Sequence, residues 1–163
     1  MSNILSSKTI NKLPDYLKKD QKIVLVGGCF DVLHPGHVVF LEKAKKVGDI
    51  LIVLLESDLK VRKLKGRSRP VHNQKQRAKV LSALKSVDFI VMLPYMEKDN
   101  EYISLIAKIK PGIIAVTKEY PNINYHQNVA KLVKAKIKYV TRIIGNHSTS
   151  KILNHQSRSL GKN

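Results

Sequence analysis

The chain has 163 residues, a single cysteine and a large excess of basic side chains, with 30 Lys and Arg against 12 Asp and Glu. This length and a hydrophobic content of 43% suit one packed domain of ordinary size. One cysteine excludes an intramolecular disulfide, and no stretch approaches the roughly 18 apolar residues of a membrane span. We therefore expect one cytoplasmic domain at 21–155, preceded by a leading helical segment at 1–20 and followed by a flexible basic tail at 156–163.

Apolar runs alternate with helical periodicity along the whole chain. The leading segment favours a short helix at 10–18 with a break at Pro14. A first buried strand at 23–26 follows, and after it the turn at Pro35-Gly36 precedes a helix that starts at or just before His37. The later predicted elements are strands at 50–55, 89–93, 113–116 and 137–140 and helices at 73–85, 102–109, 125–135 and from about Ser148. The alternation predicts a Rossmann-like, doubly wound α/β fold, with a five-stranded parallel sheet and helices on both faces.

The segment after the first strand has the layout of a nucleotide phosphate site. Gly27 and Gly28 lack a Cβ, so a phosphate could approach the backbone closely. The free N–H groups of the helix that starts near His37 would face a ligand beyond the carboxyl edge of the strand. His34 and His37 flank this point and can donate hydrogen bonds to phosphate oxygens. For either histidine alone, the alternative is an exposed turn residue.

Basic side chains are concentrated in two blocks. Residues 59–87 contain ten Lys or Arg and no acid, and residues 120–163 contain eight and no acid. Such blocks are typical of nucleic-acid binding, but an aromatic content of 6% without tryptophan gives no interleaved RNA-binding pattern. A positive cleft for an anionic substrate explains part of the excess equally well, so nucleic acid stays an alternative partner that is not favoured.

Four motifs follow one another along the chain in a fixed order. His34-Pro35-Gly36-His37 has the form HxGH, and Gly28-Cys29-Phe30-Asp31 extends it to GxFDxxHxGH. Next come the segment at 57–70, a helix bearing Arg77, and the serine/threonine-rich run at 147–152. Together they resemble the HxGH nucleotidyltransferase superfamily of cytidylyltransferase type over roughly residues 20–155, closest to heptose-1-phosphate adenylyltransferases, archaeal FAD synthases and glycerol-3-phosphate cytidylyltransferases.

The resemblance implies the HUP-type nucleotidyltransferase fold, a homodimer and a set of site residues. The implied catalytic residues are His34, His37, Lys63, Lys65 and Arg77. The implied nucleotide-binding residues are Gly28, Cys29, Phe30, Gly36, Thr117, Ser148, Thr149, Ser150 and Lys151. Asp31 and Lys118 are expected near the acceptor or the metal, although a structural hydrogen-bonding role for Asp31 is equally open.

The implied reaction is direct in-line transfer of a nucleoside monophosphate, AMP favoured, to a phosphorylated small molecule with release of pyrophosphate. Lys63 and Lys65 are expected on a mobile loop that closes over the triphosphate, and they share neutralisation of the pyrophosphate with Lys151. Mg²⁺ is expected to arrive with the triphosphate and to be held by phosphate oxygens and water, without a dedicated protein site. Surface lysines and a simple helix cap are the alternatives for these residues.

The segment at 115–121 departs from the related enzymes. Heptose and FAD enzymes carry a GGD or GYD motif after the fourth strand, whereas this chain has Ala115-Val116-Thr117-Lys118-Glu119-Tyr120-Pro121. This departure changes what can approach the strand end, so neither the heptose substrate nor the adenine preference carries over from those enzymes. The segment at 61–70 resembles the adenylyltransferase branch, which makes ATP the first choice of nucleotide and CTP the second. Glycerol phosphate, a sugar phosphate and FMN stay open as acceptors. The alternatives to an adenylyltransferase are a CTP-dependent cytidylyltransferase and a nucleotide- or RNA-binding protein without turnover.

Overall fold

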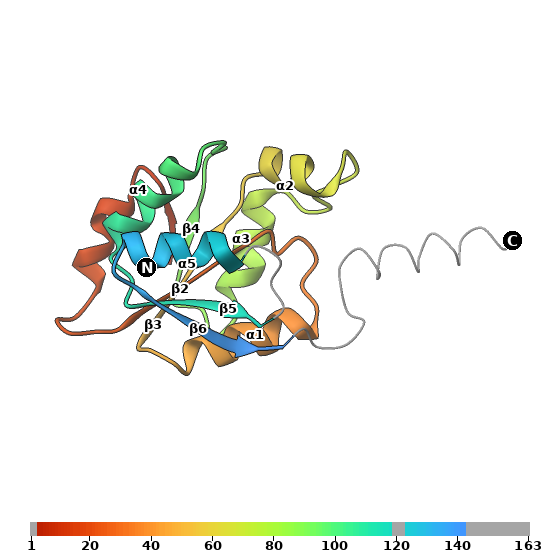
Figure 1. The fold of residues 1–163 in the computed structure, drawn as a ribbon. Coiled ribbons are helices and arrows are strands. Elements are labelled where there is room, and N and C mark those ends of the chain that lie inside the picture. The colour runs from red at the N-terminus through yellow and green to blue at the C-terminus, as the bar shows by residue number, and fades with distance from the viewer. Residues whose placement is uncertain (1–2, 119–122, 143–163) are drawn as a thin grey trace, which may run out of the picture.

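The computed structural model describes residues 3–118 and 123–142. Within them a six-stranded sheet has the strand order β1-β4-β3-β2-β5-β6, and all of its strands are parallel (Figure 1). The strands are β1 (Ile4–Ser6), β2 (Ile23–Gly28), β3 (Ile50–Leu55), β4 (Phe89–Met92), β5 (Ile113–Thr117) and β6 (Lys136–Thr141). The helices are the 3₁₀ helix η1 (Ile10–Tyr16), α1 (Pro35–Lys45), α2 (Asp58–Lys65), α3 (Gln74–Ser82), α4 (Asp99–Ile109) and α5 (Ile123–Leu132).

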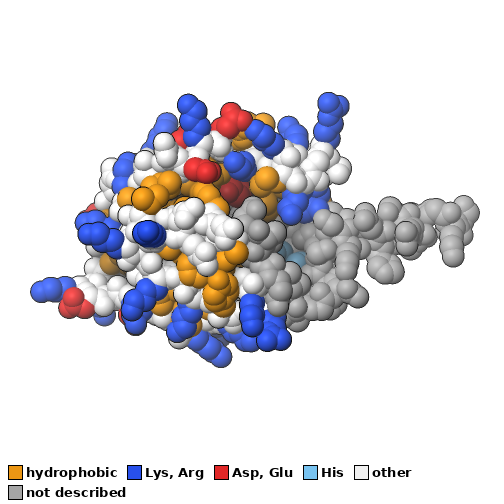
Figure 2. Space-filling view, in the orientation of Figure 1, with side chains coloured by type: hydrophobic (Ala, Val, Ile, Leu, Met, Phe, Trp, Pro, Cys, Tyr) orange, Lys and Arg blue, Asp and Glu red, His pale blue; other side chains and the backbone are white. Residues whose placement is uncertain are grey.

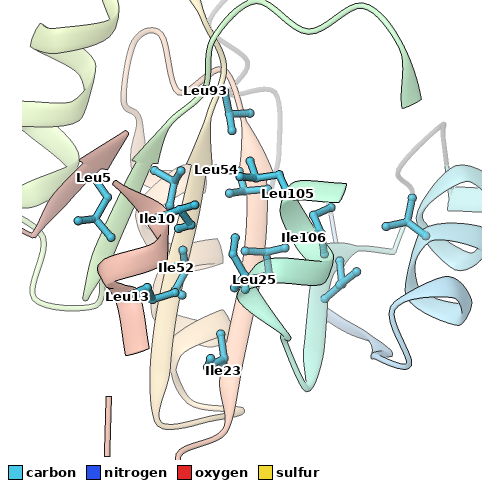
Figure 3. Close-up of a cluster of buried hydrophobic side chains, with 14 of the residues drawn as sticks. Leu5, Ile10, Leu13, Ile23, Leu25, Ile52, Leu54, Leu93, Leu105 and Ile106 are labelled. Carbon is cyan, nitrogen blue, oxygen red and sulfur yellow. The ribbon is translucent and has the colours of Figure 1, made fainter. Parts of the chain in front are cut away.

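The central strands are buried on both faces because their side chains are apolar in both directions. On β2, Leu25 packs with η1, α4 and α5 on one face, whereas Val24 and Val26 pack with α1 and α3 on the other. Figure 3 shows the first of these cores, in which Leu25 and Ile52 of the sheet meet the side chains of η1 and α4. Helices therefore cover both faces of the central strands, and open parallel sheets of this kind bind ligands at the carboxyl ends of their strands.

The structure confirms the predicted doubly wound parallel sheet and, apart from α2, the elements from β2 to β6, with boundary shifts of one to three residues at most ends. It corrects the leading segment, which contains a strand and a 3₁₀ helix in place of one α-helix. β1 is the sixth strand and pairs with the edge of the sheet through Ile4↔Ile90 and Leu5↔Val91. Three residues are too few to show a strand period, which is why the sequence pattern missed it.

The connection between β3 and α3 was also wrongly expected to be a loop. It contains α2, which starts at the N-cap Ser57, whose side chain accepts a hydrogen bond from the backbone N of Lys60 at 3.2 Å. Val61 is the only buried residue of this helix, so its sequence has almost no apolar period. The expected helix from Ser148 and the tail at 156–163 lie outside the described residues.

The strand order reverses beside β2, which creates the place where open parallel sheets bind ligands. β2 pairs with β3 as far as Gly28↔Leu55. With β5 it pairs, within the described residues, only at Val24↔Ile113 and Leu25↔Ile114. The two strands β2 and β5 therefore separate toward their carboxyl ends. Among the described helices, none is long and apolar enough to cross a membrane.

We expect Gly48→Ala to destabilise the fold. A Cβ at Gly48 would lie 2.5 Å from Cγ2 of Val24 and 2.8 Å from the backbone O of Lys22. Relieving that overlap should lower the free energy of unfolding by about 1–3 kcal/mol in urea denaturation followed by circular dichroism. Gly112→Ala is the matched control, since its Cβ would meet Cγ of Lys22 at an ordinary 3.5 Å. Equal destabilisation of the two variants would contradict this packing account.

Candidate active site

The loop after β2 starts with a glycine that makes room for an aromatic ring. A Cβ at Gly28 would lie 2.8 Å from Cε2 of Phe30, which only a shift of the buried ring could relieve. Phe30 itself has a positive φ of 43°, an uncommon conformation for a bulky residue. Its ring centroid lies 5.2 Å from that of His37. Gly28 and Phe30 thus shape the wall behind the two histidines, whereas a Cβ at the exposed Gly27 would meet nothing within 4 Å.

The two histidines stand together at the start of α1. His34 is the N-cap residue, and its carbonyl accepts the backbone N–H groups of His37 at 2.9 Å and Val38 at 3.3 Å. The rings of His34 and His37 stack with centroids 3.8 Å apart. A Cβ at Gly36 would come within 3.0 Å of Cε1 of His34, so this position also needs a small residue.

Burial and the neighbouring His34 lower the pKa of His37 from 6.5 to about 4, while the backbone of Val32 acts in the opposite direction. Its Nδ1 is buried and has no partner of ordinary hydrogen-bond geometry within the described residues. The imidazole is therefore neutral near pH 7 and carries a single N–H. A pair of imidazoles at the N-terminus of a helix, where the helix dipole is positive, is an arrangement that favours an anion.

Asp31 is used inside the protein. Its side chain is buried and accepts hydrogen bonds from Nε of Arg69, from the backbone N of Val71 at 2.8 Å and from the backbone N of His72 at 3.1 Å. Burial works to raise the pKa of Asp31, but these hydrogen bonds outweigh it and hold the pKa below its usual range. Both carboxylate oxygens are thus engaged, so Asp31 serves to hold the 69–72 segment against the loop after β2.

Arg77 was expected among the catalytic residues, and the structure places its side chain inside the protein. Its side chain is fully buried and makes four hydrogen bonds to protein acceptors. The acceptors are the carbonyls of His72 at 3.0 Å, Cys29 at 2.5 Å and Glu56 at 2.9 Å, and the carboxylate of Asp58 at 2.6 Å. In this arrangement Arg77 is a positioning residue that joins the carboxyl ends of β2 and β3 to the start of α2.

The two lysines of α2 differ in their surroundings. Nζ of Lys63 forms an exposed ion pair with Glu97 at 2.6 Å and lies 3.4 Å from the Tyr95 hydroxyl. Lys65, the last residue of the helix, is exposed. Its charge acts to lower the pKa of the Cys29 thiol, but burial outweighs it and the pKa of this thiol is raised overall. Lys65 is consequently the lysine of this pair whose field reaches the loop after β2.

Three residues that the sequence did not single out lie on the β3 side of this loop. Glu56 directly follows β3, and its backbone N donates to the carbonyl of Gly28 at 3.1 Å. Its carboxylate accepts from the Tyr102 hydroxyl, while Lys60 lies 5.2 Å from the centre of the Tyr102 ring. Burial raises the pKa of Glu56. The position of Glu56 at the end of a buried strand was the one sequence signal that could have indicated it.

The structure brings most of the expected site residues to one edge of the sheet. Thr117 ends β5, next to β2, and the backbone N of exposed Lys118 donates to the carbonyl of Thr141 at 2.8 Å. The expected residues Ser148, Thr149, Ser150 and Lys151 lie outside the described residues. Within 3–118 and 123–142, no group of three or more His, Cys, Asp and Glu side chains could hold a metal ion.

Sequence comparison identifies a family and several curated relatives of this chain. The model of the family described as cytidylyltransferase-like matches residues 25–158. The bifunctional protein HldE of Campylobacter jejuni subsp. doylei is 48% identical over 103 residues, which are 63% of this chain and 22% of that protein. The bifunctional protein HldE of Aliarcobacter butzleri is 39% identical over 152 residues, 93% of this chain and 30% of that protein. The chain thus spans less than a third of the length of these curated relatives.

Solved structures agree with this assignment. A lipopolysaccharide core biosynthesis protein of Thermoplasma volcanium has a TM-score of 0.59 and 27% identity, covering 76% of this chain and 97% of that one. Pantoate-beta-alanine ligase of Francisella tularensis, solved with a β,γ ATP compound and β-alanine, has a TM-score of 0.61. Its 17% identity over 94% of this chain and 76% of that one shows a likeness of fold. Because the family model covers most of the sequence, including the histidine pair at the start of α1, the chain belongs to the cytidylyltransferase-like family.

Proposed function

We propose that this protein transfers a nucleoside monophosphate, preferably AMP from ATP, to a phosphorylated small molecule and releases pyrophosphate. The observation that carries the proposal is the stacked pair His34 and His37 at the N-terminus of α1. The pair follows the loop after β2, beside the point where β2 and β5 separate. This is where an open parallel sheet accommodates the phosphates of a nucleotide.

The reaction needs no protein nucleophile. An oxygen of the acceptor phosphate attacks the α-phosphorus, forming a new P–O bond, while the bond from the α-phosphorus to the bridging oxygen breaks and pyrophosphate leaves with that electron pair. Neutral His37 donates an N–H to a non-bridging oxygen, and the first-turn N–H groups of α1 add positive potential. Catalysis therefore comes from positioning and electrostatics.

A divalent metal ion would bind at this site together with the triphosphate, coordinated by its phosphates. Asp31, the acid that the sequence placed near the metal, has both oxygens occupied by protein donors. The side chains near the histidines therefore suit Mg²⁺ held mainly by phosphate oxygens and water, where it neutralises charge on the phosphates. Lys65 adds a fixed positive charge on the β3 side of the loop.

The relatives support a sugar phosphate as the first acceptor to test. Both curated relatives reported above are HldE proteins, and the structural neighbour from Thermoplasma volcanium is named for lipopolysaccharide core biosynthesis. The sequence similarity to heptose-1-phosphate adenylyltransferases points the same way, and it favours ATP over CTP. Glycerol phosphate and FMN complete the acceptor panel.

We expect His37→Ala to lower the rate of pyrophosphate release from ATP, Mg²⁺ and the accepted acceptor by about 10²–10³-fold, because a donor to the transferring phosphate is lost. His72→Ala is the matched control, since the His72 side chain is exposed and its loop contacts use the backbone. A coupled pyrophosphate assay measures both variants. Undiminished turnover in His37→Ala would locate the chemistry elsewhere, and RNA binding with a steep salt dependence but no turnover would favour the RNA-binding alternative.

We expect Lys65→Ala to lower kcat/KM for ATP by about 10-fold or more, and Lys63→Ala to lower it by less. The reason is that Lys65 acts electrostatically on the loop after β2, whereas Lys63 is paired with Glu97 on the surface. Steady-state kinetics with varied ATP compare the two variants. A larger loss in Lys63→Ala would reverse this assignment of the two lysines.

Folding stability should depend on pH through His37. Its pKa is about 4 in the folded protein and 6.5 in the unfolded chain, so the unfolded chain binds more protons as the pH falls through this window. Acidification from pH 7 to pH 5 should therefore cost about 2 kcal/mol of stability through this group. We expect His37→Gln to remove that part of the pH dependence in urea denaturation at the two pH values. Parallel losses in the wild type and the variant would contradict the lowered pKa.

A further inference from the structure

Glu56 is a half-buried carboxylate at the edge of the proposed active site. It follows the last residue of β3, and its backbone N donates to the carbonyl of Gly28 at 3.1 Å. The next residue after Gly28 is Cys29, and the charge of Glu56 acts to raise the pKa of the Cys29 thiol. The carboxylate therefore lies on the β3 side of the loop that the transferring phosphate would approach.

The protein uses only part of the hydrogen-bonding capacity of Glu56. Among the described residues, its one side-chain donor is the Tyr102 hydroxyl, at 3.2 Å from Oε1 and 3.1 Å from Oε2. A carboxylate can accept about four hydrogen bonds. Nζ of Lys60 donates to the carbonyl of Met96 at 2.9 Å and lies over the Tyr102 ring, and it acts on Glu56 through its charge. Glu56 is thus held in place with oxygen lone pairs left for a ligand.

The location of Glu56 matches the acceptor end of the site. A nucleotide at the point of strand reversal occupies the β2 and β5 side, where Thr117 ends β5. The β3 side is then left for the attacking molecule, whose phosphate finds positive charge from Lys65. Glu56 cannot face that phosphate, because two anionic groups repel each other.

The part of the acceptor that meets Glu56 must therefore donate hydrogen bonds. An amine is disfavoured because the charges of Lys60 and Lys65 act in the same region. Resting on the proposed nucleotidyl transfer, we propose that Glu56 binds a hydroxyl group of the acceptor and so selects phosphorylated polyols and sugars, with Tyr102 as its positioning residue. A hydrogen bond from a hydroxyl to a charged oxygen is strong enough to decide between acceptors.

The test uses steady-state kinetics of the full chain with ATP and Mg²⁺. Glucose 1-phosphate and glycerol 3-phosphate are the hydroxyl-bearing acceptors, and ethyl phosphate is the comparison without a hydroxyl. We expect Glu56→Gln to raise KM for the better hydroxyl-bearing acceptor by about 10-fold or more, while KM for ATP and for ethyl phosphate changes by less than about twofold. Tyr102→Phe should raise the same acceptor KM by a smaller factor without lowering kcat. Glu42→Gln, an exposed acid on α1, is the matched control and should change nothing.

A thermal melt verifies that each variant is folded. If Glu56→Gln melts early, Glu56→Asp keeps the charge but withdraws the carboxylate by one methylene, and it should raise the acceptor KM as well. An acceptor KM within twofold of wild type in both variants overturns the role of Glu56 and leaves the transfer reaction standing. A rise confined to KM for ATP or to the Mg²⁺ requirement also overturns it, because Glu56 would then serve the nucleotide or the metal. Wild-type protein that releases no pyrophosphate with any of these acceptors, with a heptose 1-phosphate or with FMN overturns the proposed function and this inference together.

Discussion

The buried guanidinium of Arg77 is the interaction on which the geometry of the site depends. It joins α3 to the loop after β2, through Cys29, and to the connection between β3 and α2, through Glu56 and Asp58. A fourth hydrogen bond holds the carbonyl of His72, just before α3. A charge taken out of water is tolerated only where its hydrogen bonds are made, and here each bond also satisfies a backbone or side-chain acceptor. The carboxyl ends of β2 and β3 are therefore fixed relative to each other before any ligand binds.

Asp31 supplies a second anchor with the opposite charge. It accepts hydrogen bonds from Arg69, Val71 and His72, so the same 69–72 segment is held from both sides, by an acid of the β2 loop and by Arg77 of α3. Gln74 adds to this network by donating to the carbonyls at the ends of β3 and β4. Such support keeps the start of α1 and its histidine pair in one geometry, which is the requirement for electrostatic catalysis.

The strong positive charge of the chain is distributed more widely than the site. Lys and Arg side chains are spread over the face seen in Figure 2, and only a few acidic side chains lie among them. Some of this charge is neutralised locally, as in the pairs Lys63–Glu97 and Lys45–Asp88. The remaining charge gives the surface a positive potential that attracts anions. The charge of Lys65 extends this potential to Cys29 in the loop after β2.

Local sequence determined the core elements and the start of the site. Uninterrupted aliphatic runs define β2, β3 and β5, and the turn at Pro35-Gly36 defines the start of α1, because these signals depend on neighbouring residues alone. The same locality explains what the sequence left out. The strand β1 needs β4 beside it, and α2 has a single buried residue, Val61, so neither has a period of its own.

Only the tertiary structure decided what the charged residues near the site do. Arg77 and Asp31 have side chains that suit phosphate and metal, yet both are occupied by partners inside the protein. The partners of Asp31 are 38 or more positions away in the sequence, and Arg77 has one partner 48 positions away besides nearer ones. Glu56 is held on the proposed acceptor side by its backbone hydrogen bond to Gly28 of β2 and by the hydroxyl of Tyr102, 46 positions away. The sequence by itself determined which strands and which helix start build the site, whereas the partner of each charge was decided by packing, since hydrogen bonds between distant segments exist only once the sheet has formed.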